Sequence, residues 1–167
     1  DITAAEKILS AAVKRAPDIP AFRVSLGKIL LYRKQEKEAL AHFDEALELR
    51  PGYIEPLRMI ATIHIKNKDF AQAAARIEKQ MKLAPPNPMY DFLLARIFEV
   101  CGDAVRSETH YQKAAGSGNF PEFYNALAGF YIRKGLLQKA EKQYMEALRM
   151  APKAFAAHMG LGLVYES

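Results

Sequence analysis

A short pattern of residues returns about every 34 positions along the chain and constrains the fold more than any other feature. In the segment 22–51, Leu26 and Gly27 are followed by Ala39, Phe43, Ala46 and Pro51. A period of this length is typical of stacked helical arrays. Later copies fill the same slots with similar residues: Ile60, Ala61, Ala73, Ile77, Gln80 and Pro85, then Leu94, Ala95, Ser107, Tyr111 and Ala114, then Leu127, Ala128, Ala140, Tyr144, Ala147 and Pro152.

Each period contains two amphipathic runs of about a dozen residues, which are too short to be stable helices alone in water. Small residues such as Gly27 and Ala39 allow two helices to approach closely, and large ones such as Leu26 and Phe43 fill the space between them. Proline after the second run cannot continue a helix and separates one unit from the next. The pattern therefore predicts an all-α fold of paired helices.

These residues resemble the tetratricopeptide repeat (TPR) family, whose unit is a 34-residue helix-turn-helix. The segment from His158 to Tyr165, HMGLGLVY, gives the best single match, and its glycines are expected to serve close packing. No unit has the family's tryptophan; Phe22 and Tyr90 are its expected substitutes. The resemblance implies a right-handed superhelical α-solenoid of antiparallel helix pairs, with no strand.

The repeat frame divides the chain into six parts. Residues 1–19 correspond to the second helix of a truncated repeat, whose Thr3 and Glu6 have the spacing of a capping box. Asp1 stands where an initiator methionine would be, so we expect the chain to begin inside a longer protein. Four full repeats are expected at 20–53, 54–87, 88–120 and 121–154, and residues 155–167 form a first helix without its partner.

Composition agrees with a globular α-helical array. Half of the 167 residues are hydrophobic and 26% are charged, and the net charge of +5 comes from lysine and arginine interleaved with glutamate. No run has transmembrane length, and no signal peptide is apparent. We expect a soluble protein without membrane insertion, in the cytoplasm or alternatively the periplasm, since one cysteine leaves the compartment unknown.

Residues that could carry catalysis or bind a metal are scattered. The four histidines, His42, His64, His110 and His158, have no ligand spacing such as HExxH, and the nearest carboxylates are expected on other helix faces. Cys101 has no CxxC partner and is expected to be a semi-buried structural thiol. The sequence therefore predicts no enzyme, no metal site and no cofactor.

The expected binding surface follows from the resemblance, because family members line a concave groove with positions 2, 5, 6, 9, 12 and 13 of each first helix. Apolar groups there, methionine among them, suit an adaptable peptide site. Alternatives are that flanking repeats or neighbouring copies cover these groups, or that ligands bind the convex helices or the loops. The predicted ligand-groove residues are Lys28, Tyr32, Arg58, Met59, Lys66, Met89, Phe92, Leu93, Arg96, Asn125 and Arg133.

We expect a protein-interaction scaffold within a larger protein, binding an apolar, partly acidic peptide or protein. The two-carboxylate clamp of family members that bind chaperone tails is missing, because positions 5 and 9 do not read Lys and Asn in any repeat. The alternative is an RNA-binding helical-repeat protein, since Tyr32 lies near Lys28 and Phe92 near Arg96. Nucleic acid is not the expected partner. Self-association through Leu9 and Val13 or through Leu161 and Tyr165 is expected.

Overall fold

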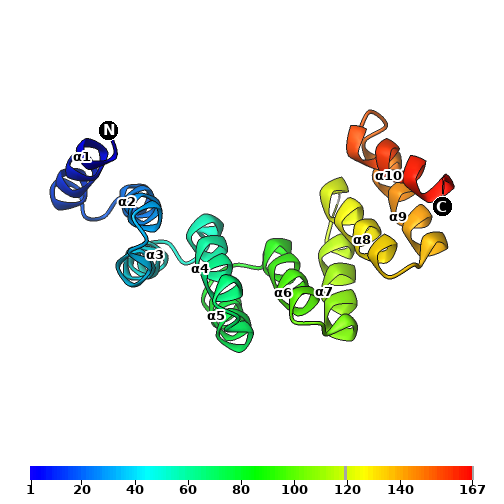
Figure 1. Ribbon diagram of the computed structural model, residues 1–167, viewed down its shortest axis with the longest axis horizontal. Helices are drawn as coiled ribbons and strands as arrows, with labels where there is room; N and C mark the ends of the chain where they lie inside the picture. The colour runs from blue at the N-terminus through cyan, green and yellow to red at the C-terminus, as the bar shows by residue number, and fades with distance from the viewer. Residues whose placement is uncertain (119, 167) are drawn as a thin grey trace. The chain divides into compact units, whose positions relative to one another are not determined.

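The computed structural model describes residues 1–118 and 120–166, which form ten α-helices and no strand (Figure 1). This confirms the predicted all-α fold. The helices are α1 (Ile2–Arg15), α2 (Pro20–Tyr32), α3 (Glu36–Leu49), α4 (Ile54–Lys66), α5 (Phe70–Leu83), α6 (Pro88–Val100), α7 (Ala104–Gly116), α8 (Pro121–Arg133), α9 (Leu137–Met150) and α10 (Phe155–Tyr165).

The starts of the helices follow from local sequence. Proline opens α2, α6 and α8, where its fixed φ suits the first helical residue and its missing N–H costs nothing. Asn87 and Asp103 cap α6 and α7 by accepting a backbone N–H at 2.9 Å. The predicted capping box of α1 is wrong: its cap is Asp1, which accepts from the backbone N–H of Thr3 at 2.9 Å.

A left-handed residue occupies the same place in the turn of each helix pair. Gly102 and Gly135 take φ values of 88° and 70° there, and Lys34 and Lys68 take 62° and 61°. L-residues incur a steric cost in this region, which glycine avoids. Two of the four turns therefore carry a lysine where glycine would fit with less strain.

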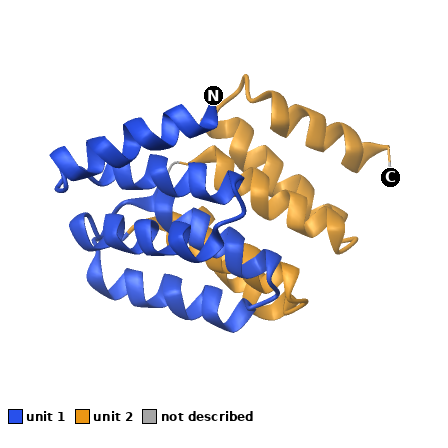
Figure 2. Cartoon of the chain, turned by 60° about the vertical axis from the view of Figure 1, so that its left-hand side comes forward, with its two compact units in different colours: residues 1–86 blue, residues 87–167 orange. Residues whose placement is uncertain are grey.

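The chain divides into two compact units, residues 1–86 and 87–167, and each is described by itself (Figure 2). In unit 1, α2 pairs with α3 and α4 with α5, while α1 packs on α2 and α3 on α4. In unit 2, α6 pairs with α7 and α8 with α9, α7 packs on α8, and α10 packs on α9 and α8. Each helix therefore buries its apolar side mainly against its neighbours in sequence.

Close packing of small against large residues holds neighbouring helices together. A Cβ added to Gly27 would lie 2.6 Å from the ring of Phe43, which is 0% exposed. A Cβ on Gly160 would lie 2.1 Å from the ring of Tyr144. The expectation that Gly162 also serves close packing is wrong, because a Cβ there would meet nothing within 4 Å.

One slot that is usually small holds a buried glutamine. Gln80 is 2% exposed; its Nε2 donates to the carbonyl of Pro51 at 2.6 Å, and its Oε1 accepts from Arg76 at 2.6 Å. Arg76 is in turn held by Asp44 through Nε and Nη2, at 3.1 and 2.8 Å. Because the buried amide has partners on both sides, the polar side chain is tolerated there.

Candidate functional site

A surface cavity in unit 2 brings together several residues of the predicted groove. It has a volume of about 640 Å³ and lies between α6 and α8, with α7 behind them. We call it the unit 2 cavity. It is lined by Phe92, Arg96, Glu99, Val100, Tyr111, Asn125, Ala126, Gly129 and Arg133.

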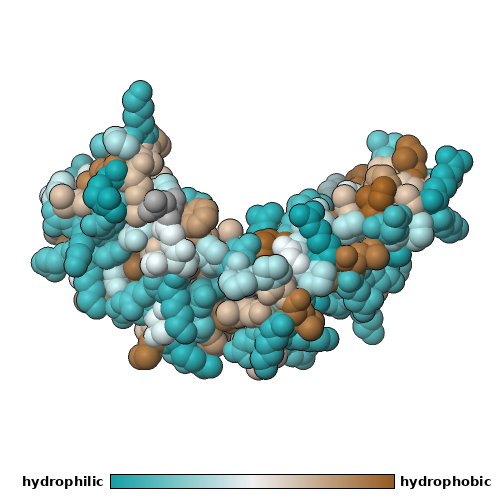
Figure 3. Space-filling view, turned by 180° about the vertical axis from the view of Figure 1, so that it is seen from behind, coloured by the Kyte–Doolittle hydropathy of each residue, from teal (hydrophilic) through white to brown (hydrophobic). Residues whose placement is uncertain are grey.

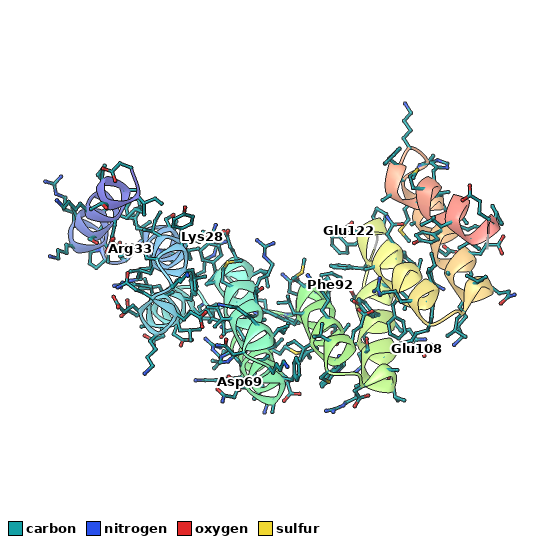
Figure 4. The ribbon with its side chains drawn as sticks, in the orientation of Figure 1. Lys28, Arg33, Asp69, Phe92, Glu108 and Glu122 are labelled. Carbon is teal, nitrogen blue, oxygen red and sulfur yellow. The ribbon has the colours of Figure 1, made fainter. Side chains whose placement is uncertain are left out.

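Aromatic rings form one wall of the unit 2 cavity. Phe92 lies on the side of α6 that faces α8 (Figure 4), and its ring centroid is 5.5 Å from that of Phe123 and 6.0 Å from that of Tyr111. The ring of Phe92 is half-buried, whereas Phe123 and Tyr111 are buried. Packed rings behind it hold Phe92 in place, so the wall presents a rigid apolar surface.

A carboxylate network occupies the other end of the cavity. Glu99 accepts from the hydroxyl of Tyr111 at 2.8 Å and from Nε of Arg133 at 2.6 Å. Burial, together with the hydrogen bond to Glu99, raises the pKa of Tyr111, which therefore stays a hydroxyl donor at neutral pH. The hydrogen bond with Glu99 also raises the pKa of Arg133. Much of the charge of Arg133 is thus compensated inside the protein.

Arg96 and Asn125 have polar atoms that this network does not use. Arg96 is exposed, and no hydrogen bond or ion pair joins its guanidinium to another of the described residues. Asn125 Oδ1 is buried but has no hydrogen-bond partner in the described part of the chain. A buried acceptor without a donor is costly, so a ligand N–H that reached it would be stabilised.

Both lysines of the predicted groove in unit 1 are already paired with carboxylates. Lys28, labelled on α2 in Figure 4, forms an ion pair with Glu55 of α4, and the hydrogen bond in this pair lowers the pKa of Glu55. Lys66 forms an ion pair with Glu36, to which Asn67 also donates at 3.1 Å. Consequently these two lysines offer less charge to a ligand than the sequence indicated.

The remaining predicted residues differ in exposure. Tyr32 is 73% exposed, Arg58 is exposed, and Met59 is half-buried. Met89 is half-buried and packs against the core of unit 2. The prediction that Leu93 lines the groove is wrong. Leu93 is 4% exposed and belongs to the core, because α6 is apolar around most of its circumference and turns this residue inward.

Tyr111, His110 and Cys101 differ from what the sequence predicted for them. Sequence reasoning missed Tyr111 because it belongs to a second helix, outside the positions carried over from the family. His110 does have a carboxylate, since its Nδ1 lies 2.8 Å from Asp91 Oδ1 and its ring stacks on Phe98. Cys101 was expected to be semi-buried and is exposed, with its Sγ donating to the carbonyl of Phe98 at 3.3 Å.

Metal and membrane signals are weak in the described residues. Residues 1–118 and 120–166 contain no group of three or more His, Cys, Asp or Glu side chains arranged to hold a metal ion. Among those residues, no helix combines the length and apolar character needed to cross a membrane.

Comparison with curated proteins finds similar sequences over most of this chain. Two curated proteins named Protein O-mannosyl-transferase TMTC1 match: the mouse protein is 24% identical over 148 residues, 84% of this chain, and the human protein is 24% identical over 154 residues, 87% of this chain. The chain spans only 15% and 17% of the length of these relatives.

Solved structures share the fold at low identity. Yeast Tom70 has a TM-score of 0.84 at 18% identity, covering 99% of this chain and 36% of Tom70. TTC0263, a TPR protein of Thermus thermophilus, has a TM-score of 0.76 at 20% identity, covering 99% and 91%. YrrB, described as a TPR protein with an unusual peptide-binding site, has a TM-score of 0.59 at 17% identity, covering 95% and 82%.

Family models match most of the sequence. Three models, each described as tetratricopeptide repeat, match residues 1–54, 30–97 and 121–153. The helix pairs, their small-to-large packing and these matches agree. The chain belongs to the tetratricopeptide repeat family.

Proposed function

We propose that this chain is a non-catalytic protein-interaction scaffold and that the unit 2 cavity binds a peptide with an apolar anchor and a carboxylate. The observation that carries the proposal is the half-buried ring of Phe92 beside Arg96, whose guanidinium has no carboxylate partner in the described residues. An apolar side chain against a rigid ring, next to a cation, suits such a peptide. The peptide-binding site named for YrrB supports the same proposal by analogy of fold.

Each polar group of the cavity would bind a different part of the peptide. A ligand carboxylate would meet Arg96, because Arg133 is already compensated by Glu99. A backbone N–H of the peptide would donate to Asn125 Oδ1, which gives that buried acceptor a partner. Glu99 itself disfavours a ligand with dense negative charge, so one or two carboxylates fit better than an acidic run.

The RNA alternative has less support. Each cation-aromatic pair that suggested it lies beside a carboxylate: Lys28 is paired with Glu55, and Glu99 lines the cavity with Phe92 and Arg96. Carboxylates at the contact surface repel phosphate. The name of the TMTC1 proteins gives no support for transferase activity in this chain, because the match spans 15% of the mouse relative.

A peptide selection followed by titration tests the proposal. Peptides selected from a random displayed library on the purified chain should be enriched in an aliphatic or aromatic residue near an Asp or Glu. Phe92→Ala should weaken the best peptide by about 1–3 kcal/mol, roughly 5- to 150-fold in Kd. Arg96→Glu should weaken it more at low salt than at high salt, because screening shortens the reach of the charge.

Matched controls separate the cavity from general effects. Phe155→Ala removes an exposed aromatic ring, and Lys113→Glu reverses an exposed charge, both in unit 2 and outside the cavity. Neither should change peptide affinity. Selected peptides that lack acidic residues, or affinities indifferent to both Phe92→Ala and Arg96→Glu, would reject this site. Single-stranded RNA that binds with steep salt dependence and loses affinity on Arg96→Glu would favour the alternative instead.

A further inference from the structure

Gly129 is a glycine in the interior of α8 whose place helix packing does not explain. Glycine destabilises a helix interior relative to alanine, because its backbone loses more conformational freedom on folding. At Gly27 and Gly160 close packing offsets that loss, since an added Cβ would lie 2.6 and 2.1 Å from a buried ring. Apart from its own helix backbone and chain neighbours, a Cβ on Gly129 would have one described atom within 4 Å, Nη1 of Arg133 at 3.3 Å. Gly129 therefore lacks the close contact that requires glycine at the other two positions.

Gly129 instead lines the unit 2 cavity. The lining residues of α6 have larger side chains, whereas Ala126 and Gly129 of α8 have almost none. Counted from the first residue of each first helix, the same position holds Lys28, Thr62 and Arg96 in α2, α4 and α6. A side chain of ordinary size at this position of α8 would occupy the cavity where it borders the helix backbone. The glycine therefore keeps that part of the cavity open.

The aromatic wall of the unit 2 cavity indicates which kind of side chain suits the open space. The ring of Phe92 meets those of Phe123 and Tyr111 at interplanar angles of 42° and 64°, with centroids 5.5 and 6.0 Å apart. Aromatic rings prefer tilted and edge-to-face contacts, because the negative face of one ring attracts the positive edge of another. A ring that enters the cavity can extend this cluster and lie flat against the backbone at Gly129. An aliphatic side chain lacks the ring electrostatics and gains less.

Exposed apolar side chains on another part of unit 2 do not gather in this way. On the face of unit 2 seen at the left of Figure 3, hydrophobic side chains lie scattered among hydrophilic ones. Single apolar residues of this kind are normal on a protein surface. That face therefore offers an aromatic ligand no continuous apolar wall.

Arg133 offers a second reason for a small residue at position 129, but the geometry weighs against it. Nε of Arg133 donates to Glu99 at 2.6 Å, which holds the guanidinium beside Gly129. An alanine Cβ 3.3 Å from Nη1 would be accommodated by a small shift at the end of a flexible side chain. The ion pair therefore tolerates alanine at this position and does not require glycine.

We propose that Gly129 determines which side chains the unit 2 cavity accepts. Its missing side chain leaves room for an aromatic residue of the peptide between Phe92 and the backbone of α8. The inference rests on the proposed peptide-binding function and names the apolar anchor as Phe, Tyr or Trp. Arg96 lies one helical turn from Phe92 on α6 and would bind an acidic residue next to the anchor. Functional sites often retain residues that lower stability, and Gly129 is such a residue.

Substituting Gly129 should change stability and binding in opposite directions. Gly129→Ala should raise the urea midpoint of unfolding, because alanine is the better helix former. The probe for binding is the best peptide from the selection, synthesised with Phe, Leu or Ala as its apolar residue and titrated by fluorescence anisotropy. Gly129→Ala should weaken the Phe version about tenfold, and Gly129→Leu should weaken it further, since one carbon in a fitted pocket has an effect of this size. The Ala version should change much less, because its side chain does not reach the α8 backbone.

Gly162→Ala is the matched control for helix propensity. It also places alanine in a helix interior of unit 2 where nothing lies within 4 Å, but outside the cavity. It should raise the urea midpoint and leave peptide affinity unchanged. A second control combines Gly129→Ala with Arg133→Gln. The loss of affinity on adding Gly129→Ala should persist in that background, because the ligand itself meets the new methyl group.

Three results would overturn the inference and leave the peptide site in place. The first is a selection dominated by aliphatic anchors. The second is affinity for the Phe version that depends on Phe92 and Arg96 but ignores both substitutions of Gly129. The third is a loss of affinity that disappears in the Arg133→Gln background. Affinity that ignores substitutions at Phe92, Arg96 and Gly129 alike would instead reject the peptide site itself.

Discussion

Replacing Gly160 by alanine tests the close packing of small against large residues between neighbouring helices. The added Cβ would lie 2.1, 2.4 and 2.6 Å from Cζ, Cε1 and Cε2 of Tyr144. Tyr144 is 6% exposed and belongs to the core of unit 2, so its ring has little room to move. The substitution therefore forces either the ring or helix α10 away from its position.

Two opposing effects determine how much Gly160→Ala changes the free energy of unfolding. Alanine in place of glycine in a helix interior stabilises by about 1 kcal/mol. Overpacking a filled core costs about 1–3 kcal/mol, and a contact this short calls for the upper end of that range. We therefore expect Gly160→Ala to lower the free energy of unfolding by about 1–2 kcal/mol, against the direction of helix propensity.

Gly162 supplies the matched control two residues further along α10. A Cβ there meets nothing within 4 Å, so Gly162→Ala should gain about 0.5–1 kcal/mol from propensity alone. Urea unfolding followed by circular dichroism measures both variants, and hydrogen exchange of residues 155–165 shows whether the loss is concentrated in α10. The two substitutions should move stability in opposite directions.

A double-mutant cycle with Tyr144→Leu identifies the cause. Leucine lacks the three ring atoms that the new Cβ would approach, so the penalty of Gly160→Ala should largely disappear in that background. A stabilising effect of Gly160→Ala in the unchanged chain, or an equal penalty in both backgrounds, would refute the packing argument.

Three further outcomes are expected. Lys68→Gly should raise the free energy of unfolding by up to about 1 kcal/mol in urea titration, because glycine relieves the left-handed strain while giving back some entropy; a loss of stability would contradict this. Gln80→Leu should lower it by about 1–3 kcal/mol, because Arg76 loses an acceptor inside a buried network, and thermal melts with no change would argue against that network. The hydrogen bond from Lys139 lowers the pKa of Glu108, so this carboxylate contributes stability at neutral pH that is lost as the pH falls through its folded-state pKa. The destabilisation caused by Glu108→Gln should therefore shrink when urea titrations are repeated in acid, and an effect independent of pH would exclude the ion pair as its source.

The 34-residue recurrence determined the fold from the sequence alone, because each helix packs mainly on its neighbours along the chain. With local partners, the small and large slots specify which residues meet, as Gly27 and Phe43 do. Proline after the second run, as at Pro51 and Pro85, separated one unit from the next for an equally local reason. The same frame brought Phe92, Arg96, Asn125 and Arg133 to one cavity.

Tertiary structure decided how each predicted surface residue is used. The frame gives a position but not the angle at which a helix settles, so Leu93 was expected in the groove and is buried. Packing also pairs residues that lie on different helices: Lys28 meets Glu55, and Glu99 meets both Arg133 and Tyr111. Such pairings depend on side-chain reach between helices, which no periodicity encodes. Only packing determines which carboxylate lies within reach of each cation. The packed helices therefore decide which cations of the predicted groove remain available to a ligand.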